Sequence, residues 1–355
     1  MLGHAVHFVD GGVILRRKRM PTQTDAVGRG QAHGKVILMG EHAVVYGEPA
    51  ISIPFRPVNA NVAVQAADEE DVLNCGYYHG PLRKSPHSLK GLTELISVVR
   101  QNESMPPFLS VDIASNIPPA YGLGSSAAVA AALVRALYDF YHRPLPRKHL
   151  LELMNIQETH AHGTPSGVDA RTAISRCPLW YVRGCRPLEI SLPRPLFLVV
   201  AASNSPGRTL DVIRRVHENS RHFVDYDTPI TRLGEMTRQA VEAIDEGNYQ
   251  ELGRLMTQSH QELINLGVST LHLNSLVKKA LGVGALGAKL TGSGGGGSIV
   301  AIAADNKVQE RIVHVLAEAE AIRIWATTVP ANQRLGDIHM RIGKGTLNRR
   351  CRKVH

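Results

Sequence analysis

Hydrophobic residues follow two different periods along the chain, and together they predict a two-domain α+β protein. Short apolar or alternating runs predict strands at residues 34–40, 51–65, 109–113, 196–202 and 298–303. Apolar residues at helical spacing predict helices at residues 88–100, 126–162, 209–217, 229–246, 249–266 and 306–321. The segment between the first two strands is expected to form a turn. A proline-rich stretch at 187–195 predicts a domain boundary near residue 190, and 355 residues suit two domains.

A glycine- and serine-rich segment, P-P-A-Y-G-L-G-S-S-A-A over residues 118–128, stands between a predicted strand and an alanine-rich helix. Its glycines allow close backbone approach, and the free N–H groups and dipole at the helix start favour an anion. Its serines add hydroxyl groups for a phosphate or Mg²⁺. The Gly-Lys-Ser/Thr ending of a Walker loop is absent, which argues against a P-loop NTPase. We expect a nucleotide to contact Pro118, Gly122, Leu123, Gly124, Ser125, Ser126 and Ala127.

A second glycine cluster, G-A-K-L-T-G-S-G-G-G-G, covers residues 287–297. A flexible linker is the alternative interpretation, but apolar strand residues flank the cluster on both sides. Two glycine clusters suggest a nucleotide pocket shared between the domains. The second cluster would contribute Gly292, Gly294 and Gly295 to that pocket.

Two carboxylates are candidates for chemistry. Asp169 follows the tight turn H-G-T-P-S-G-V over residues 162–168, where it is either a general base for a hydroxyl proton or a helix N-cap. Glu158 lies on the preceding helix, and it is either a Mg²⁺ ligand beside the phosphates or a solvated helix residue.

Three further polar residues stand near the first strand. Lys35 would neutralise charge that moves with a phosphoryl group, although a lone lysine is usually a surface residue. His42 beside Glu41 would hold a polar substrate, and a structural or solvated histidine in a turn is the alternative. Each of these residue types suits the transfer of a phosphate to a polar acceptor, so we treat them together as candidate site residues.

The formal net charge of +9 is carried by the two ends of the chain. Residues 16–19 supply four positive charges, five more lie within 344–353, and aromatic residues make up only 5%. We therefore interpret residues 1–28 as a disordered basic extension and residues 343–355 as a basic tail, with no nucleic-acid partner. Nucleic-acid binding through these ends is the alternative, and it would be steeply salt-dependent.

Features that the sequence lacks indicate where in the cell the protein is located. No apolar run approaches the roughly 20 residues that span a bilayer, and no signal peptide is recognisable, so we expect no membrane partner. The four cysteines show no paired C-x-x-C spacing, which is typical of a reducing compartment. The protein is therefore expected in the cytoplasm.

The sequence resembles the GHMP kinase superfamily and, within it, the mevalonate kinase family. The glycine-serine loop at 118–128 is typical of the superfamily. The strings G-E-H-A-V-V-Y-G at 40–47 and H-G-T-P-S-G-V-D at 162–169 point to the narrower family, and K-L-T-G-S-G-G-G-G at 289–297 completes the set. Together these motifs anchor roughly residues 30–300.

The resemblance implies an N-terminal domain of the ribosomal-protein S5 type over 29–190, a C-terminal ferredoxin-like domain over 191–342, and an active site between them. It implies a catalytic role for Asp169 with Lys35 as its charge-neutralising partner, and Mg²⁺ ligation by Ser126 and Glu158. It also implies a homodimer. The substrate-contacting residues would be Glu41, His42 and, by a weaker match, Thr209.

The activity implied by the resemblance is ATP-dependent phosphorylation of the 5-hydroxyl group of (R)-mevalonate, in isoprenoid biosynthesis. Ala170, Arg171 and Ser293 depart from the usual family pattern and leave acceptor preference open. The alternatives are a related kinase for homoserine, phosphomevalonate, a sugar or the 3-hydroxyl of mevalonate, and a catalytically silent nucleotide-binding protein.

Overall fold

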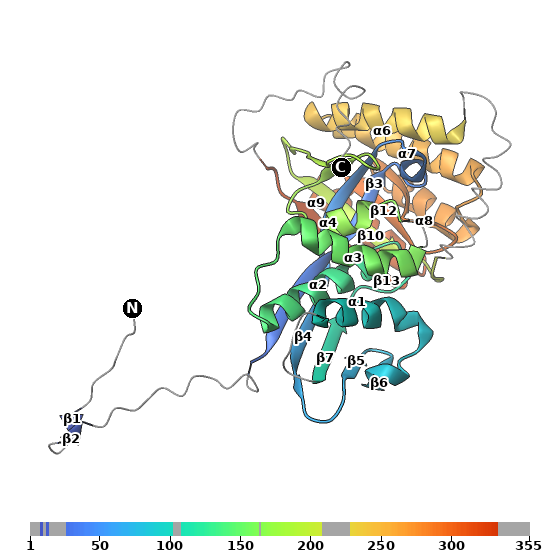
Figure 1. The fold of residues 1–355 in the computed structure, drawn as a ribbon. Helices are drawn as coiled ribbons and strands as arrows, with labels where there is room; N and C mark the ends of the chain where they lie inside the picture. The colour runs from blue at the N-terminus through green and yellow to red at the C-terminus, as the bar shows by residue number, and fades with distance from the viewer. Residues whose placement is uncertain are drawn as a thin grey trace.

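A computed structural model describes residues 8–9, 12–13, 26–101, 108–162, 165–207 and 228–332. The predicted helix at 209–217, the residue Thr209, the tail at 343–355 and most of the extension at 1–28 lie outside these ranges. Within the extension, β1 (Phe8–Val9) pairs antiparallel with β2 (Gly12–Val13). The other elements build two sheets with their covering helices (Figure 1).

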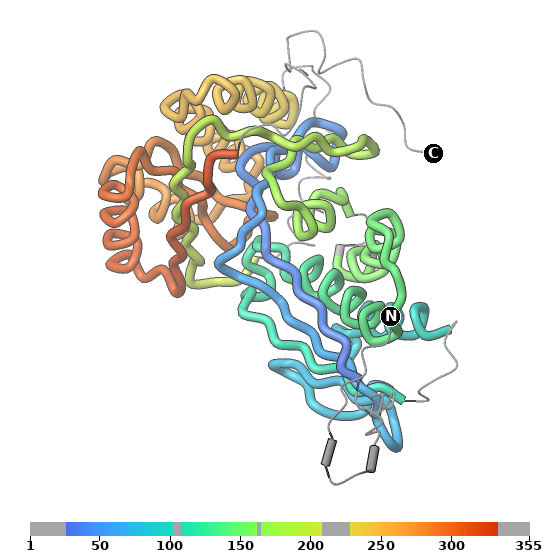
Figure 2. The backbone as a smooth tube through the Cα atoms, turned by 90° about the vertical axis from the view of Figure 1, so that its left-hand side faces the viewer, coloured from blue at the N-terminus to red at the C-terminus, as the bar shows by residue number. Residues whose placement is uncertain are grey.

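The first sheet has seven strands in the order β6-β5-β7-β4-β8-β9, with β3 paired to β4. Its long strand β4 (Ala50–Ala67) pairs antiparallel with β3 (Gly28–Met39), and the two run side by side through the length of the sheet (Figure 2). The shorter strands are β5 (Val72–Cys75), β6 (Tyr78–Pro81), β7 (Phe108–Ser115), β8 (Leu179–Tyr181) and β9 (Leu188–Glu189).

Four α-helices accompany this sheet: α1 (Lys90–Arg100), α2 (Ser125–Phe140), α3 (Arg147–His162) and α4 (Val168–Ala173). Helix α2 packs directly on β3 and β4. The close approach depends on glycine, because a Cβ atom at Gly30 would lie 1.9 Å from the carbonyl oxygen of Ala132. Within the described residues, three short 3₁₀ helices join the elements: η2 (Ala43–Tyr46), η3 (Leu82–Lys84) and η4 (His87–Leu89).

The second sheet has four antiparallel strands in the order β11-β12-β10-β13. Its strands are β10 (Leu196–Ala202), β11 (Gly287–Thr291), β12 (Ser298–Ala303) and β13 (Arg323–Val329). Its helices are α6 (Pro229–Asp245), α7 (Tyr249–Asn265), α8 (Leu271–Gly282) and α9 (Asn306–Glu318). This strand order is that of a ferredoxin-like fold, in agreement with the expected α+β class.

One hydrophobic core continues from the first sheet into the second. It joins residues of β3, β4 and α2 to Leu198 and Val200 of β10, Ile302 of β12 and Leu252 of α7. The chain passes from the first sheet to the second between β9 and β10. The two halves therefore pack as one body, and the turn after β3 lies against the second half.

Most of the predicted elements are confirmed. β10 and β12 have the predicted bounds, and α6, α7 and α9 end within a few residues of the predicted ends. The helical region predicted at 126–162 is two helices, because Pro144 and Pro146 lie between α2 and α3 and cannot continue a helix. The turn between β3 and β4 contains η2.

Candidate active site

A cleft of about 390 Å³ lies where the two halves of the described chain meet. Its walls come from β3, the turn at 41–45, the glycine-serine loop, helices α2, α3 and α4, and the loop after β11. Most of the predicted site residues line it: Lys35, Glu41, His42, Gly122, Leu123, Gly124, Ser125, Ser126, Glu158, Asp169 and Gly292. Pro118, Ala127, Gly294 and Gly295 are not among the lining residues, so their contact with a nucleotide remains a prediction.

The glycine-serine loop leads directly into the first turn of α2. Gly124 is the N-cap of this helix in a left-handed conformation, with φ of 74°, which glycine adopts without steric cost. Ser125 and Ser126 occupy the first turn, where backbone N–H groups lack partners within the helix. The expected anion-binding arrangement of strand, loop and helix start is therefore present.

The two glycine clusters touch each other across the cleft. A Cβ atom on Gly122 would lie 2.4 Å from the carbonyl oxygen of Thr291 and 3.2 Å from the Cα atom of Gly292. The Ser298 hydroxyl also donates a 2.9 Å hydrogen bond to the carbonyl oxygen of Tyr121. The linker alternative for residues 287–297 is wrong, because β11 and β12 are fully buried strands and the loop between them packs on the glycine-serine loop.

Lys35 and Asp169 form an ion pair inside the cleft, with 2.9 Å between Nζ and Oδ1. Lys35 is almost completely buried, which rules out the surface interpretation, while the Asp169 side chain remains 21% exposed. Gly124 makes room for the lysine, because a Cβ atom there would lie 2.7 Å from Lys35 Cγ. The N-cap of α4 is Gly167, so the interpretation of Asp169 as an N-cap is wrong.

The turn that carries Asp169 is held by its neighbours. The Tyr181 hydroxyl donates a 2.7 Å hydrogen bond to the carbonyl oxygen of Ser166. The Arg171 guanidinium donates to the carbonyl oxygen of Gly167 and lies 5.2 Å from the centre of the Tyr181 ring. Arg171, which differs from the usual family pattern, thus stabilises the turn.

Glu158 reaches the cleft from α3 and is 2% exposed, so the solvated interpretation is wrong. Burial and the nearby Asp169 carboxylate raise the pKa of Glu158 to about 8, and the Ser126 hydroxyl hydrogen bonds to it. Its Oε1 atom is buried without a hydrogen-bond partner among the described residues. Gln157 donates a 3.3 Å hydrogen bond to the Ser126 hydroxyl.

Glu41 and His42 lie in the turn between β3 and η2. His42 adopts φ of 62° and ψ of −49°, an unusual conformation for a residue with a side chain. Its Nε2 lies 2.9 Å from the carbonyl oxygen of Ser293, so this nitrogen carries the proton and donates. Burial lowers the pKa of His42 to about 4, which keeps the ring neutral near pH 7.

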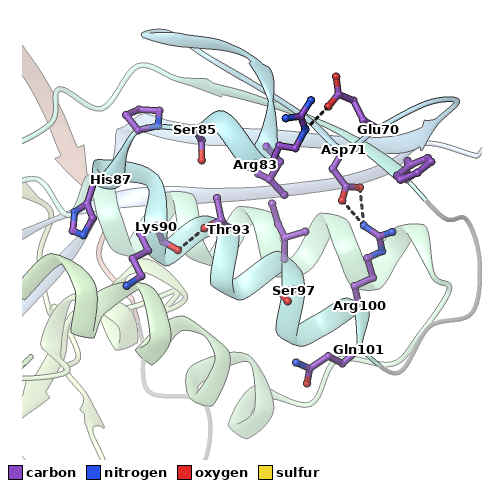
Figure 3. Close-up of a pocket in the computed structure, with 14 residues that line it drawn as sticks. Glu70, Asp71, Arg83, Ser85, His87, Lys90, Thr93, Ser97, Arg100 and Gln101 are labelled. Atoms are coloured by element: carbon purple, nitrogen blue, oxygen red, sulfur yellow. Dashed lines mark hydrogen bonds and ion pairs between the residues drawn. The ribbon is translucent and has the colours of Figure 1, made fainter.

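Another hollow of about 970 Å³ lies between α1 and the segments at 70–71 and 82–87 that flank the β5–β6 hairpin (Figure 3). Its acidic groups are already paired, Arg83 with Glu70 and Arg100 with Asp71. The Asp71 carboxylate also accepts a hydrogen bond from the backbone N–H of Leu109. These contacts join the segments around the hollow to one another, and neither of the glycine clusters lines the hollow.

Gln157 and Lys289 are polar residues of the cleft region to which the sequence analysis assigned no role. Gln157 contacts Ser126, and Lys289 forms a buried ion pair with Glu41. The position of Gln157 beside Glu158 gives no separate signal. Lys289 gives none either, because its burial at the centre of β11 is a property of the tertiary structure.

The described residues contain no helix that is both long and apolar enough to cross a membrane. They also contain no group of three or more histidine, cysteine, aspartate or glutamate residues arranged for a metal ion. A metal ion bound by one or two of these side chains would therefore need further oxygen atoms from hydroxyl groups or from a bound ligand.

The fold and this cleft define a kinase of the GHMP class. Residues 91–176 match the family described as GHMP kinases N terminal domain, and residues 240–321 match GHMP kinases C terminal. The chain is 33% identical over 322 residues to the mevalonate kinase of Aeropyrum pernix, which covers 86% of this chain and 98% of that one.

Two solved structures give the same assignment. The mevalonate kinase of L. major, solved in complex with R-mevalonate, is 28% identical, with a TM-score of 0.72 and coverage of 86% of this chain and 97% of that one. The mevalonate kinase of methicillin-resistant Staphylococcus aureus is 32% identical, with a TM-score of 0.63 and coverage of 85% and 98%. The chain belongs to the mevalonate kinase family.

Proposed function

We propose that the protein transfers the γ-phosphoryl group of ATP to the 5-hydroxyl group of (R)-mevalonate, a step of isoprenoid biosynthesis. The observation that carries the proposal is the ion pair of the buried Lys35 with Asp169 beside the glycine-serine loop, in a cleft that the Glu41–His42 turn also lines. This arrangement provides an anion site, a base and acceptor-side polar groups within one cleft. Family membership selects mevalonate among the acceptors.

In this mechanism Asp169 orients the acceptor hydroxyl and accepts its proton as the hydroxyl oxygen attacks the γ-phosphorus. The bond from the γ-phosphorus to the bridging oxygen breaks, and ADP leaves with the electron pair. Lys35 balances negative charge at the reacting oxygens, since its ammonium group is fixed 2.9 Å from Asp169. The N–H groups at the start of α2 hold the phosphates, so positioning supplies most of the catalysis.

The side chains of Ser126 and Glu158 suit Mg²⁺. Burial and, after it, the Asp169 carboxylate raise the pKa of Glu158, and Glu158 Oε1 has no partner among the described residues. A hard divalent cation shared with ATP would satisfy both features, because Mg²⁺ prefers carboxylate, hydroxyl and phosphate oxygens. When bound, Mg²⁺ would neutralise phosphate charge.

The first test is ADP release from the purified protein with Mg²⁺ and ATP, comparing (R)-mevalonate with homoserine, galactose and phosphomevalonate. We expect turnover with mevalonate only. Asp169→Asn is the matched variant, because it keeps the shape of the side chain and removes the base. Its kcat should fall by about a hundredfold or more while ATP binding is retained.

The possible results separate the alternatives. Turnover with another acceptor would assign the cleft to a different GHMP kinase, and ATP binding without turnover would indicate a silent nucleotide-binding protein. An Asp169→Asn variant that folds normally and keeps most of its turnover would contradict the base role. We also propose a cytoplasmic homodimer, which light scattering and cell fractionation test directly.

A further inference from the structure

Lys289 is a completely buried lysine at the centre of β11. Its ammonium group forms an ion pair with Glu41 Oε1 and donates a 2.7 Å hydrogen bond to the carbonyl oxygen of Leu290. The contact joins the second sheet to the turn that follows β3, across 248 residues of sequence. A buried charge of this kind needs a paired and hydrogen-bonded partner, and Glu41 supplies it.

Only one of the two Glu41 oxygens is used in this contact. Oε2 is buried and has no hydrogen-bond partner within the described part of the chain, although Glu41 lines the cleft beside Lys35 and His42. Buried carboxylate oxygens are rarely left without a donor. A hydroxyl group of a bound acceptor is a donor of the required chemistry.

We propose that Lys289 is a positioning residue for acceptor binding, which holds Glu41 through Oε1 so that Oε2 accepts a hydrogen bond from an acceptor hydroxyl group. The proposal rests on the proposed function, because it takes the acceptor to be a hydroxy acid. An ionised Glu41 also repels the carboxylate of such an acceptor. The acceptor therefore binds with a hydroxyl group, and not its carboxylate, against this turn.

The charges around Glu41 support this role. Burial raises the pKa of Glu41, and the ammonium groups of Lys289 and Lys35 oppose that effect. The neighbouring histidines add no charge near pH 7, because burial lowers the pKa of both His42 and His260 to about 4. Lys289 is thus the main cation that favours the ionised form of Glu41.

Holding the two halves together is the alternative role for this pair, but other contacts already do so at the same place. The Thr291 hydroxyl accepts a 3.0 Å hydrogen bond from the Ile37 backbone N–H and donates a 2.9 Å hydrogen bond to the Ile37 carbonyl oxygen. His42 adds its hydrogen bond to the Ser293 carbonyl oxygen. The contact between the two halves therefore does not depend on Lys289 alone.

The test compares Lys289→Met, which keeps the length of the side chain and removes the charge, with the double variant Glu41→Gln/Lys289→Met. KM for mevalonate and KM for ATP are measured from about pH 6 to about pH 9, because burial raises the pKa of Glu41 above its ordinary value. In Lys289→Met we expect KM for mevalonate to rise about ten- to hundredfold and KM for ATP to change by less than about twofold.

The pH dependence of kcat/KM for mevalonate distinguishes a positioning role of Lys289 from a purely structural role. Without Lys289, Glu41 keeps its proton to higher pH, so kcat/KM for mevalonate should rise with pH in Lys289→Met. The double variant has no carboxyl to titrate, so it should keep a raised KM without that pH dependence. It also buries no unpaired charge, so it is expected to fold even where the single variant does not.

Three outcomes would overturn the proposal: an equal rise in both KM values without a new pH dependence, an unchanged KM for mevalonate in Lys289→Met, or a wild-type KM in the double variant. Absence of mevalonate turnover in the wild-type protein would instead refute the proposed function. Because the wild-type protein is assayed first, the two failures are distinguishable.

Discussion

Replacement of Gly122 by alanine tests the contact between the two glycine clusters. The added Cβ atom would lie 2.4 Å from the Thr291 carbonyl oxygen, whereas ordinary van der Waals contact begins at 3.4 Å, so the backbones must separate by about 1 Å. The positive φ of 76° at Gly122 adds about 1–2 kcal/mol of strain for a residue with a side chain.

Gly184→Ala is the matched control. Gly184 has φ of 79°, almost the same as Gly122, but a Cβ atom there would meet nothing within 4 Å. We expect Gly184→Ala to lose about 1–2 kcal/mol of the free energy of unfolding and to keep its kcat. Gly122→Ala should lose a further ~1–3 kcal/mol from overpacking, and its kcat should fall about a hundredfold, because a displacement of about 1 Å misaligns the phosphates and the acceptor.

Urea unfolding followed by circular dichroism gives the stability difference, and coupled detection of ADP gives kcat. Equal losses of stability in the two variants, with equal kcat, would mean that the clusters do not touch as described. A large loss of stability in Gly122→Ala with normal kcat would leave the contact in place and refute its link to catalysis.

Three further predictions concern the same cleft. Gly124→Ala places a Cβ atom 2.7 Å from the flexible Lys35 side chain, so kcat should fall about tenfold or more with a smaller loss of stability than in Gly122→Ala; an unchanged kcat would contradict the packing. Burial holds the pKa of His42 and of His260 at about 4, below the ordinary 6.5, so the unfolded chain binds protons first as the pH falls. The free energy of unfolding should drop by about 3 kcal/mol for each histidine between about pH 6.5 and pH 4, measured by urea unfolding, and a variant with both replaced by glutamine should show a shallower drop. Chelation of Mg²⁺ should abolish ADP release and Glu158→Gln should raise the Mg²⁺ concentration needed for turnover, whereas release that persists in the chelator would exclude the metal.

The sequence predicts the buried elements best. β10 and β12 were expected with their observed bounds because each is a continuous apolar run, which in a strand signals burial on both faces. β13 was missed because its residues are half exposed, from Arg323 to Val329, and alternate only weakly between apolar and polar. Helix α8 was missed although Thr270 provides an N-cap and Leu273, Leu276 and Val277 recur at helical spacing.

The site could be predicted only where its residues form local motifs. The glycine-serine loop and the turn before Asp169 are continuous in sequence, so their chemistry is visible there. The pairing of Glu41 with Lys289 cannot be predicted from the sequence, because 248 residues separate the two. The sequence also does not show whether a lysine is buried or exposed. The pKa of Glu158 depends on burial and on Asp169, and both follow from tertiary structure.

Proton-coupled ³¹P NMR of the product formed from ATP and (R)-mevalonate tests the central claim most directly. Phosphate on the 5-hydroxyl group is attached to a CH₂ group, so its signal should be a triplet through coupling to two protons. Phosphate on the tertiary 3-hydroxyl group has no such protons and would give a single line. A triplet in the wild-type reaction, strongly reduced with Asp169→Asn, is the predicted result; a single line, or no phosphorylated mevalonate at all, would contradict the account.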